Sequence, residues 1–519
     1  MVPRAHAQPV RLPRTDRRDG RHEPARRRRR TGGRTSARRA PPGAAEKQKV
    51  GEEAVDGSRL AEEFTHLVRK HRVPGAQLAL YRDGALTQCA TGVESVRTGR
   101  PVTSTSAFPY GSVTKFHTAM LALQFASDGD LDLDEPLGRL LPELKNAANR
   151  HLRDATVRQL LSHTAGLADN VDCDDMRGAS YQRYTTACGD TPGLSAPGLA
   201  FSYSNAGYCL MGRVIEVASG MDWWTALENC LLHPMGAQPA FLHDPRPGAR
   251  PHPVTDGHAV RLDGPHGSTT DGTRDATPDG IETVDHLIPL STAAAGALAG
   301  SATALVTAAR LHLDDRDSLA DDDHPELPDL LPEDAVEEMR TPVPGVRPYG
   351  LADGWGLGLM AHRNTAGDIW LGHDGAVGGA SCQLRLHPAG NTALALTANA
   401  TTGQKLWEDL LDLLRADGLD IGHHTLPLPD TPRVQDPGPY LGEYANGDLV
   451  LVVVADPGGQ LFLTRKDYFD SKLEIHEDDR FVSRDPEVDA VPVVGRFVRA
   501  EPGGPITLLQ YGGRALARR

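Results

Sequence analysis

A serine and a lysine three positions apart, Ser112 and Lys115, are the residues of this 519-residue chain whose types and spacing best suit catalysis. The segment 109–129 reads as a loop followed by a helix, on which the two side chains are neighbours in the first turn. A lysine at this end of a helix opposes the macrodipole, and burial would further favour its neutral form. A neutral amine can accept the proton of a serine hydroxyl and turn it into a nucleophile. The plain alternative is a capping serine beside a surface lysine.

Two further motifs could complete such a site. Tyr203 and Asn205 lie in a turn that leads into a helix over 205–219, so both side chains can face one cleft. A phenol can relay protons, and an amide can hold a substrate carbonyl. The glycine-rich segment 372–379 follows a strand, and its glycines permit close approach of backbone to a ligand. Taken singly, these motifs also read as a core aromatic and an ordinary tight turn.

In this order the motifs SxxK, YxN and HxG resemble the β-lactamase and penicillin-binding-protein superfamily of active-site serine enzymes. The finer similarity is to its class C-like branch, with D-aminopeptidases, esterases and D-peptidases. The segment 160–167, LLSHTAGL, and Asn399 fit this branch as well. The resemblance covers residues 57–418, and residues 425–519 resemble the lipocalin-like domain that several members carry at the C-terminus.

The resemblance implies catalytic roles for three residues. Ser112 would be the acylated nucleophile, Lys115 the base that activates it, and Tyr203 the group that passes the proton to the leaving group. In the same family the segment around His163 is structural, so we expect this histidine to be hydrogen-bonded and to support the fold. His117 is expected to serve packing rather than catalysis.

The resemblance also implies a substrate-binding set. Asn205 would orient the substrate amide, and the HxG segment would contribute His373, Gly375 and Ala376. The backbone N–H groups of Ser112 and Ala376 would form the oxyanion hole. The family's KTG motif reads HDG here, so a fixed lysine cation is replaced by a histidine that we expect to be partly charged near neutrality. Potent β-lactamase activity is therefore not expected.

The predicted fold class is α/β (α+β), with an antiparallel sheet flanked by helices, a helical subdomain and a small C-terminal antiparallel β-barrel of lipocalin type. We expect an Arg-rich disordered extension over 1–50, the serine hydrolase domain over 56–418, a Pro-rich linker over 419–439 and the barrel over 440–519. The extension suits either a basic arm for acidic partners or a translated leader. In the last region six strands are expected: 449–454, 460–464, 473–476, 480–483, 495–499 and 506–511.

Composition excludes several classes of function. Residues 1–40 hold 14 Arg, yet the whole chain carries a formal charge of −14, so its body is acidic and a poor partner for nucleic acid. No apolar run is long enough for a membrane helix, and no apolar segment follows the basic N-terminus as in a secretory signal. We therefore expect a cytoplasmic protein. The six Cys show no zinc spacing, so neither a metal nor a cofactor is expected, and a Cys173–Cys188 pair is an open alternative.

The leading functional hypothesis is a serine hydrolase that forms an acyl-enzyme on an ester, an amide or a peptide containing D-amino acids. The main alternative is a penicillin-binding-protein-type thioesterase that releases and macrocyclises a nonribosomal peptide. In that case the partner would be a peptide held as a thioester or on a carrier protein; otherwise it is a small-molecule or peptide substrate. A non-catalytic ligand sensor is the remote third hypothesis. The sequence does not decide between water and an amine as the acyl acceptor.

Overall fold

The computed structural model describes residues 57–82, 84–172, 178–249, 252–261, 280–319, 327–422, 424, 426–465, 469–484 and 492–519. The extension 1–50, Cys173 and the segment 262–279 lie outside these ranges, so the predictions made for them stay predictions. All the described residues belong to one compact unit.

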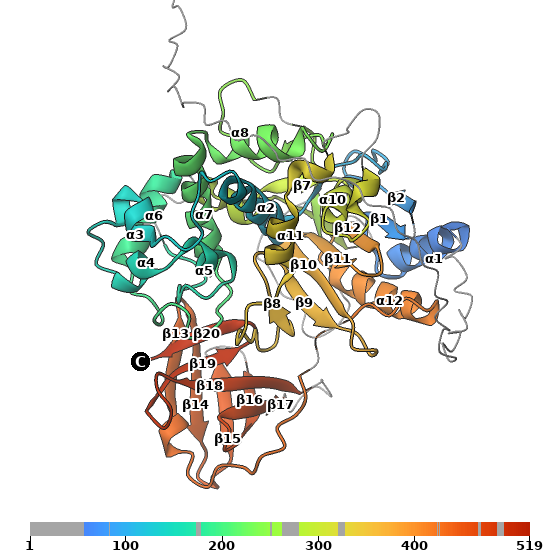
Figure 1. Cartoon of the computed structure of the whole chain (residues 1–519). Helices are drawn as coiled ribbons and strands as arrows, with labels where there is room; N and C mark the ends of the chain where they lie inside the picture. The colour runs from blue at the N-terminus through green and yellow to red at the C-terminus, as the bar shows by residue number, and fades with distance from the viewer. Residues whose placement is uncertain are drawn as a thin grey trace, which may run out of the picture. The chain divides into compact units, whose positions relative to one another are not determined.

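A seven-stranded antiparallel sheet forms the centre of the larger part of the chain (Figure 1). In order across the sheet, its strands are β2 (Ala85–Gly92), β1 (Gly75–Arg82), β12 (Thr392–Ala398), β11 (Ala380–His387), β10 (Ile369–Val377), β9 (Met360–Arg363) and β8 (Gly354–Trp355). The beginning of the described chain meets its later part where β1 pairs with β12, with Ala79 opposite Ala395. All residues of β12 are buried, which agrees with a strand covered by helices on both faces.

Helices cover the two faces of this sheet. On one face, α1 (Gly57–Lys70) packs beside α12 (Gly403–Ala416), which buries Leu406, Trp407, Leu410 and Leu414 in a shared apolar cluster (Figure 1). On the other face, α10 (Ala302–Arg310) contacts β1 and β12. The same apolar cluster includes residues of α2 (Thr114–Ser127), a helix buried around most of its circumference, as expected of a central core helix.

A helical region adjoins α2 and carries the turn that precedes Asn205. Its helices are α3 (Leu137–Leu140), α4 (Arg150–Asp154), α5 (Val157–Leu161), α6 (Tyr181–Asp190), α7 (Asn205–Ser219), α8 (Trp223–Leu227), α9 (Ala293–Gly296) and α11 (Glu333–Arg340). Helix α7 lies at the centre of this region, since α7 contacts α2, α5, α6, α8 and α9. The Ser204 side chain caps its start, and Gly220, at φ 70°, ends it. The helix predicted over 205–219 is confirmed.

Two small sheets complete this part of the chain. One contains β3 (Phe108–Pro109), β7 (Leu298–Gly300) and β4 (Ala240–Phe241); the other contains β5 (Gly257–Val260) and β6 (Ile281–Val284). Strand β3 leads directly into the turn that carries Ser112. Strands β5 and β6 form this antiparallel pair within the region 243–290, which is rich in Pro, Gly, His and Asp. Its weak periodicity concealed these strands.

The C-terminal residues form a closed eight-stranded antiparallel barrel (Figure 1). Its strands are β13 (Gly442–Asn446), β14 (Leu449–Ala455), β15 (Leu461–Arg465), β16 (Phe469–Ile475), β17 (Arg480–Arg484), β18 (Val493–Arg499), β19 (Ile506–Tyr511) and β20 (Arg514–Arg518). The barrel prediction is confirmed, but the expectation of six strands missed β13 and β20. These two strands pair with one another and close the barrel, opposing Ala445 to Ala517.

Candidate active site

The turn that carries Ser112 leaves its hydroxyl available for chemistry. Ser112 lies in a 3-10 turn, Gly111–Val113, between β3 and α2. Gly111 has a φ of 51°, a conformation that glycine adopts without strain. Helix α2 is preceded by Val113 as its N-cap, and no side chain caps either the turn or the helix. The interpretation of Ser112 as a capping residue is therefore wrong.

Lys115 is fully buried and surrounded by acceptors. Its Nζ lies 3.0 Å from the Ser112 Oγ, 2.8 Å from the Asn205 Oδ1 and 2.8 Å from the carbonyl oxygen of Ala295. The last two oxygens can only accept hydrogen bonds. In the neutral amine, the two N–H groups satisfy these acceptors and the lone pair faces the Ser112 hydroxyl. The surface-lysine interpretation is wrong.

Burial lowers the pKa of Lys115 to about 7. The electrostatic interactions with Cys209 and Asp169 act in the opposite direction, and the Arg514 charge lowers the pKa further. Near neutrality, a large fraction of the molecules therefore holds Lys115 as a neutral amine. This protonation state lets the amine accept the Ser112 proton.

Tyr203 stands next to this pair as a neutral phenol. Burial raises the pKa of Tyr203, and a hydrogen bond with Ser112 lowers this pKa in part. The Lys115 Nζ lies 5.0 Å from the centre of its ring. The phenol thus contacts Ser112 and lies close to Lys115. At neutral pH it can donate its proton and take another in exchange, as a relay requires.

Asn205 holds the lysine in place. Its Oδ1 accepts from Lys115 at 2.8 Å, and its Nδ2 donates to the Asp169 Oδ1 at 3.1 Å. Asp169 in turn lies 2.8 Å from the Arg514 guanidinium. Both ends of the amide are therefore engaged in positioning the base, and contact with a substrate amide stays a prediction.

His373 lies on β10 and is neutral. Its side chain is buried, its Nδ1 lies 2.7 Å from the carbonyl oxygen of Asp374, and burial lowers its pKa to about 3. The expectation of a partial charge near neutrality is wrong, because burial outweighs the effect of the neighbouring carboxylate. Its ring packs 5.5 Å from Trp355 and 6.2 Å from Tyr203. Its Nε2 has no hydrogen-bond partner among the described residues.

Strand β10 runs directly past the nucleophile turn at Gly375. A Cβ atom at this position would lie 2.1 Å from the carbonyl oxygen of Tyr110 and 2.9 Å from the Ser112 nitrogen, so only glycine fits. A Cβ at Gly111 would similarly lie 2.8 Å from the Ala376 nitrogen. The backbone nitrogens of Ser112 and Ala376 thus border one narrow space. Their role as an oxyanion hole stays a prediction that this close approach supports.

Two histidines outside the predicted set are packing residues. His163, at φ 57°, accepts from the Ser204 N–H at its Nδ1 and lies 4.4 Å from the Tyr203 ring. The expected hydrogen bond is therefore present at the Nδ1 atom, whereas the Nε2 atom is buried without a partner among the described residues. His117 stacks on Tyr110 at 5.8 Å, and burial lowers its pKa to about 4.

The barrel contributes residues that sequence reasoning missed. The Tyr203 N–H donates to the carbonyl oxygen of Gly513 at 2.9 Å, and the Ala515 N–H donates to the Ser202 Oγ at 3.2 Å. The Arg514 guanidinium lies 5.7 Å from the centre of the Tyr203 ring. The sequence carries no local signal for these contacts, since Arg514 belongs to no motif and arrives through the packing of a separate sheet.

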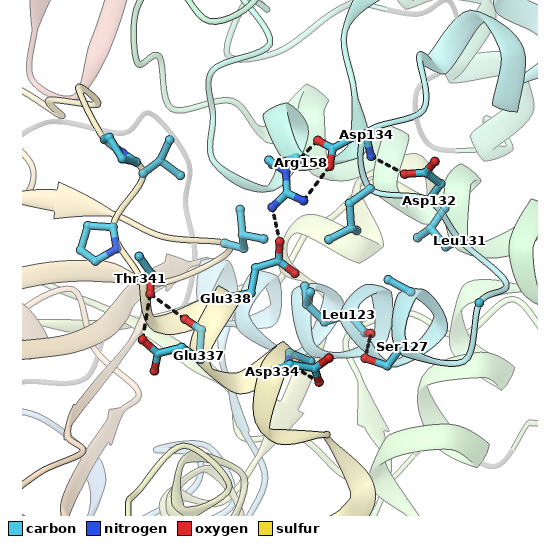
Figure 2. Close-up of a pocket in the computed structure, with 18 residues that line it drawn as sticks. Leu123, Ser127, Leu131, Asp132, Asp134, Arg158, Asp334, Glu337, Glu338 and Thr341 are labelled. Carbon is cyan, nitrogen blue, oxygen red and sulfur yellow. Dashed lines mark hydrogen bonds and ion pairs between the residues drawn. The ribbon is translucent and has the colours of Figure 1, made fainter.

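A cavity of about 910 Å³ has a described lining that does not include Ser112. Figure 2 shows the residues that line it. Arg158 bridges Asp134 and Glu338 on its wall. The hydroxyl groups of Ser127 and Thr341 also line this cavity, and they donate to backbone carbonyls at 3.0 and 2.8 Å. The Thr341 hydroxyl also lies 3.2 Å from the Glu337 carboxylate, but the described lining of this cavity contains no lysine. Ser112 lines a separate, smaller cavity of about 570 Å³.

Comparisons with known proteins agree with this geometry. The sequence profile of the Beta-lactamase family matches residues 60–417. Penicillin-binding protein 4 from Amycolatopsis lactamdurans is 32% identical over 394 residues, which cover 75% of this chain and 97% of that protein. The chain therefore belongs to the beta-lactamase family, whose members are hydrolases.

Solved structures give a finer comparison. The crystal structure of SurE is 57% identical, with a TM-score of 0.79, and the match covers 89% of this chain and 99% of that one. The structure of SurE with D-Leu matches at 56% identity and a TM-score of 0.77, with the same coverage. A D-stereospecific amidohydrolase from Streptomyces sp. is 25% identical, with a TM-score of 0.52 over 68% of this chain and 98% of that one.

Two further features are properties of the described residues. Among them, no helix is both long and apolar enough to cross a membrane. The same ranges contain no group of three or more His, Cys, Asp or Glu that could hold a metal ion.

Proposed function

We propose that this protein is an active-site serine acyltransferase or hydrolase that forms an acyl-enzyme on Ser112. The observation that carries the proposal is the buried Lys115 amine, 3.0 Å from the Ser112 hydroxyl and with a pKa near 7. A base with this pKa suits catalysis at neutral pH. The acyl donor is an ester, an amide or a thioester, including a peptide held on a carrier protein.

The acylation step follows from the hydrogen bonds. Lys115 takes the proton of Ser112 while the Ser112 Oγ attacks the carbonyl carbon of the donor. The negative charge that develops on the carbonyl oxygen is stabilised by the backbone N–H groups of Ser112 and Ala376, a contribution of about 3–4 kcal/mol per donor in other serine enzymes. Tyr203 gives its proton to the leaving group and recovers one from Lys115. The bond to the leaving group breaks, and the ester on Ser112 remains.

We infer that the donor ends in a D-amino acid. The relative SurE, 56% identical, has been solved with D-Leu, and the amidohydrolase from Streptomyces sp. is D-stereospecific. The test uses paired peptidyl thioesters that differ only in the configuration of the C-terminal residue. Faster thiol release from the D-configured donor supports the assignment, and equal or slower release contradicts it.

The acyl-enzyme itself is tested by intact mass after exposure to a fluorophosphonate. We expect one adduct on the parent protein and none on Ser112→Ala. An adduct on both proteins, or on neither, overturns the assignment of Ser112 as an activated nucleophile.

A second candidate function differs only in the acceptor. Water completes hydrolysis, whereas an amine forms a new amide, and the amine of the donor's own N-terminus yields a macrocycle. One observation favours the amine, and with it a penicillin-binding-protein-type thioesterase. Among the described residues that line the cavity beside Ser112, the one charged side chain is the carboxylate of Asp374.

A further inference from the structure

Three consecutive N–H groups in the turn that carries Tyr203 are held from two sides. The Ser202 and Ser204 N–H groups both donate to His163, the first to its carbonyl oxygen at 2.9 Å and the second to its Nδ1 at 3.1 Å. The Tyr203 N–H lies between them in the chain and donates to the carbonyl oxygen of Gly513 at 2.9 Å. The backbone that carries the phenol is therefore fixed between His163 and the barrel.

The two acceptors of His163 match the spacing of the two donors. The backbone at Ser204 is extended, with a φ of −140° and a ψ of 117°. In an extended chain, residues two apart lie on the same side and are separated by about 6.6 Å. The two hydrogen bonds show that the carbonyl oxygen and the ring of His163 both face the segment 202–204. One residue thus binds the backbone on either side of Tyr203.

Packing alone does not account for the conformation of His163. Its φ of 57° lies in the left-handed region, which residues other than glycine rarely adopt. Because its Nδ1 accepts a hydrogen bond, the neutral ring carries its proton on Nε2. That Nε2 is buried and has no partner among the described residues. Both features cost stability, and such costs are concentrated at functional sites of proteins.

The His163 ring is kept in the state that can accept the hydrogen bond. The ring is 2% exposed and its centre lies 4.4 Å from the centre of the Tyr203 ring. Burial lowers the pKa of His163 well below its usual value, and electrostatic interactions with Lys115, His373 and Arg514 lower this pKa further. The ring is therefore neutral at the pH of catalysis, and its Nδ1 stays available to the turn.

On the basis of the proton relay assigned to Tyr203 above, we propose that His163 is a positioning residue for this phenol. Its Nδ1 and its carbonyl oxygen hold the backbone on both sides of Tyr203, so that the hydroxyl stays in hydrogen-bond contact with Ser112. His163 transfers no proton itself and acts through Tyr203. A displacement of about 1 Å in a catalytic group can reduce a rate by about 10²-fold, so a small loosening of this turn is measurable.

Two variants of His163 give opposite results for positioning and for packing. His163→Phe keeps an aromatic ring and removes the Nδ1 acceptor. His163→Asn removes the ring but places an amide oxygen at the position of Nδ1, and asparagine tolerates the left-handed conformation. The measurement is the initial burst of thiol from a peptidyl thioester with a D-configured C-terminal residue. We expect His163→Phe to slow the burst by about 10- to 100-fold and His163→Asn to stay within about threefold of the parent protein. A fast His163→Phe beside a slow His163→Asn overturns the proposal.

His312→Phe is the matched control. This histidine is also buried, and neither of its ring nitrogens has a partner among the described residues. The same substitution there removes no hydrogen bond and should leave the burst unchanged.

His163→Gln keeps the proposal testable if thermal melts show that His163→Phe does not fold. Its amide oxygen lies one bond further from the backbone than that of asparagine, so it does not reproduce the Nδ1 acceptor. Both amide variants lose the ring equally. We expect the glutamine variant to be slow and the asparagine variant to be fast, and equal rates in the two contradict the role of the Nδ1 atom.

A double-mutant cycle with Tyr203→Phe separates positioning from a general loss of packing. When the phenol hydroxyl is absent, there is no relay left to position. Adding His163→Phe to this background should therefore slow the burst by less than about twofold. An equal slowing in both backgrounds would show that His163 does not act through Tyr203, and would overturn the proposal.

Labelling by a fluorophosphonate distinguishes this inference from the proposed function. In that reaction Lys115 takes the Ser112 proton, the Ser112 Oγ binds phosphorus, and the bond to fluorine breaks. Fluoride leaves as an anion without a proton from Tyr203, so His163→Phe should be labelled at the parent rate. Absence of labelling or of a thiol burst in the parent protein overturns the proposed function. Normal labelling and an unchanged burst in His163→Phe overturn only the positioning role, and a parallel loss of both contradicts action through the phenol.

Discussion

The backbone N–H of Tyr203 donates to the carbonyl oxygen of Gly513 at 2.9 Å, so the turn that carries the phenol is held by the last hairpin of the barrel. Gly513 itself donates to the carbonyl oxygen of Tyr349 at 2.6 Å. The next residue, Arg514, pairs with Asp169, which binds Asn205 and through it the lysine. The barrel thereby contributes to positioning the base, which is the basis of the first prediction.

Arg514→Leu should shift the acidic limb of the acylation pH profile to higher pH. Arg514 lowers the pKa of Lys115, whereas Asp169 raises it. Removing the guanidinium abolishes the first effect and leaves the Asp169 carboxylate uncompensated, so both changes favour the charged amine. The measurement is kcat/KM for thiol release between pH 5 and 9. Arg519→Leu, which removes an exposed arginine of the same barrel paired with Glu443, should leave the profile unchanged.

Lys115→Arg should abolish most of the acylation activity at neutral pH. A guanidinium keeps its proton, so no neutral base faces the Ser112 hydroxyl. General-base catalysis contributes about 10²- to 10⁴-fold, and we expect a loss of that size in the rate of the thiol burst. The parent rate should rise with pH through about 7 and then level off, following the Lys115 pKa. Lys405→Arg, at an exposed position, should behave like the parent protein.

Lys115 should also leave a signature in stability. Its pKa falls from 10.5 in the unfolded chain to about 7 in the fold. Between these values the unfolded chain holds a proton that the folded chain has released, so stability rises with pH by about 1.4 kcal/mol per unit for one proton. Lys115→Met lacks this contribution. Its free energy of unfolding, minus that of the parent, should therefore fall between pH 7.5 and 9.5 in urea titrations, and parallel curves would show that the lysine is not buried as described.

The contact between Ser112 and Lys115 was predictable from the sequence because the two residues are close in the chain. The spacing of Ser112 and Lys115 places both on one turn, and the helix at Asn205 follows from its serine cap and apolar face. Closure of the barrel was not predictable in detail. Strand β20 reads Arg-Ala-Leu-Ala-Arg and β13 contains Glu443 and Asn446, so neither stands out as a strand until its partner is present.

Burial and long-range contacts account for the other differences. The sequence of a glycine-rich segment does not show how deeply its histidine is buried. His373 was therefore expected to be partly charged, whereas burial lowers its pKa to about 3 and keeps it neutral. Arg514 and Tyr203 lie far apart in the chain, and their contact depends on how a barrel packs against a helical turn. No periodicity in either segment encodes that arrangement.

Tyr203→Phe should reduce acylation while preserving the fold. The variant keeps the ring that packs against His163 and loses the hydroxyl that contacts Ser112. We expect the thiol burst to slow by about 10²-fold or more, since the proton relay to the leaving group is lost. Tyr208→Phe is the matched control. Its buried hydroxyl donates to a backbone carbonyl, so it should cost about 1 kcal/mol of stability and little activity.

The reverse pattern for these two tyrosines, with activity lost in Tyr208→Phe and kept in Tyr203→Phe, would contradict the role given to Tyr203. Thermal melts of both variants, read beside the burst rates, separate the loss of a proton relay from the loss of packing. An equal fall in burst rate and in thermal stability for both variants would mean that the two hydroxyl groups only stabilise the packing of the site.

Gly375→Ala should remove activity because β10 can no longer approach the nucleophile turn. The added Cβ would lie 2.1 Å from the carbonyl oxygen of Tyr110, closer than real Cβ contacts, and the strand must shift. The Ala376 N–H then moves away from the Ser112 N–H, and the two donors no longer meet at one oxyanion. We expect the burst rate to fall by about 10²- to 10³-fold, which is the effect of losing one oxyanion donor in other serine enzymes.

Gly57→Ala is the control, because the atom nearest to its added Cβ would lie at 3.5 Å. This variant should leave both the burst rate and the stability within the range of ordinary surface substitutions. An active Gly375→Ala enzyme would remove Ala376 from the oxyanion hole and place charge stabilisation elsewhere in the site.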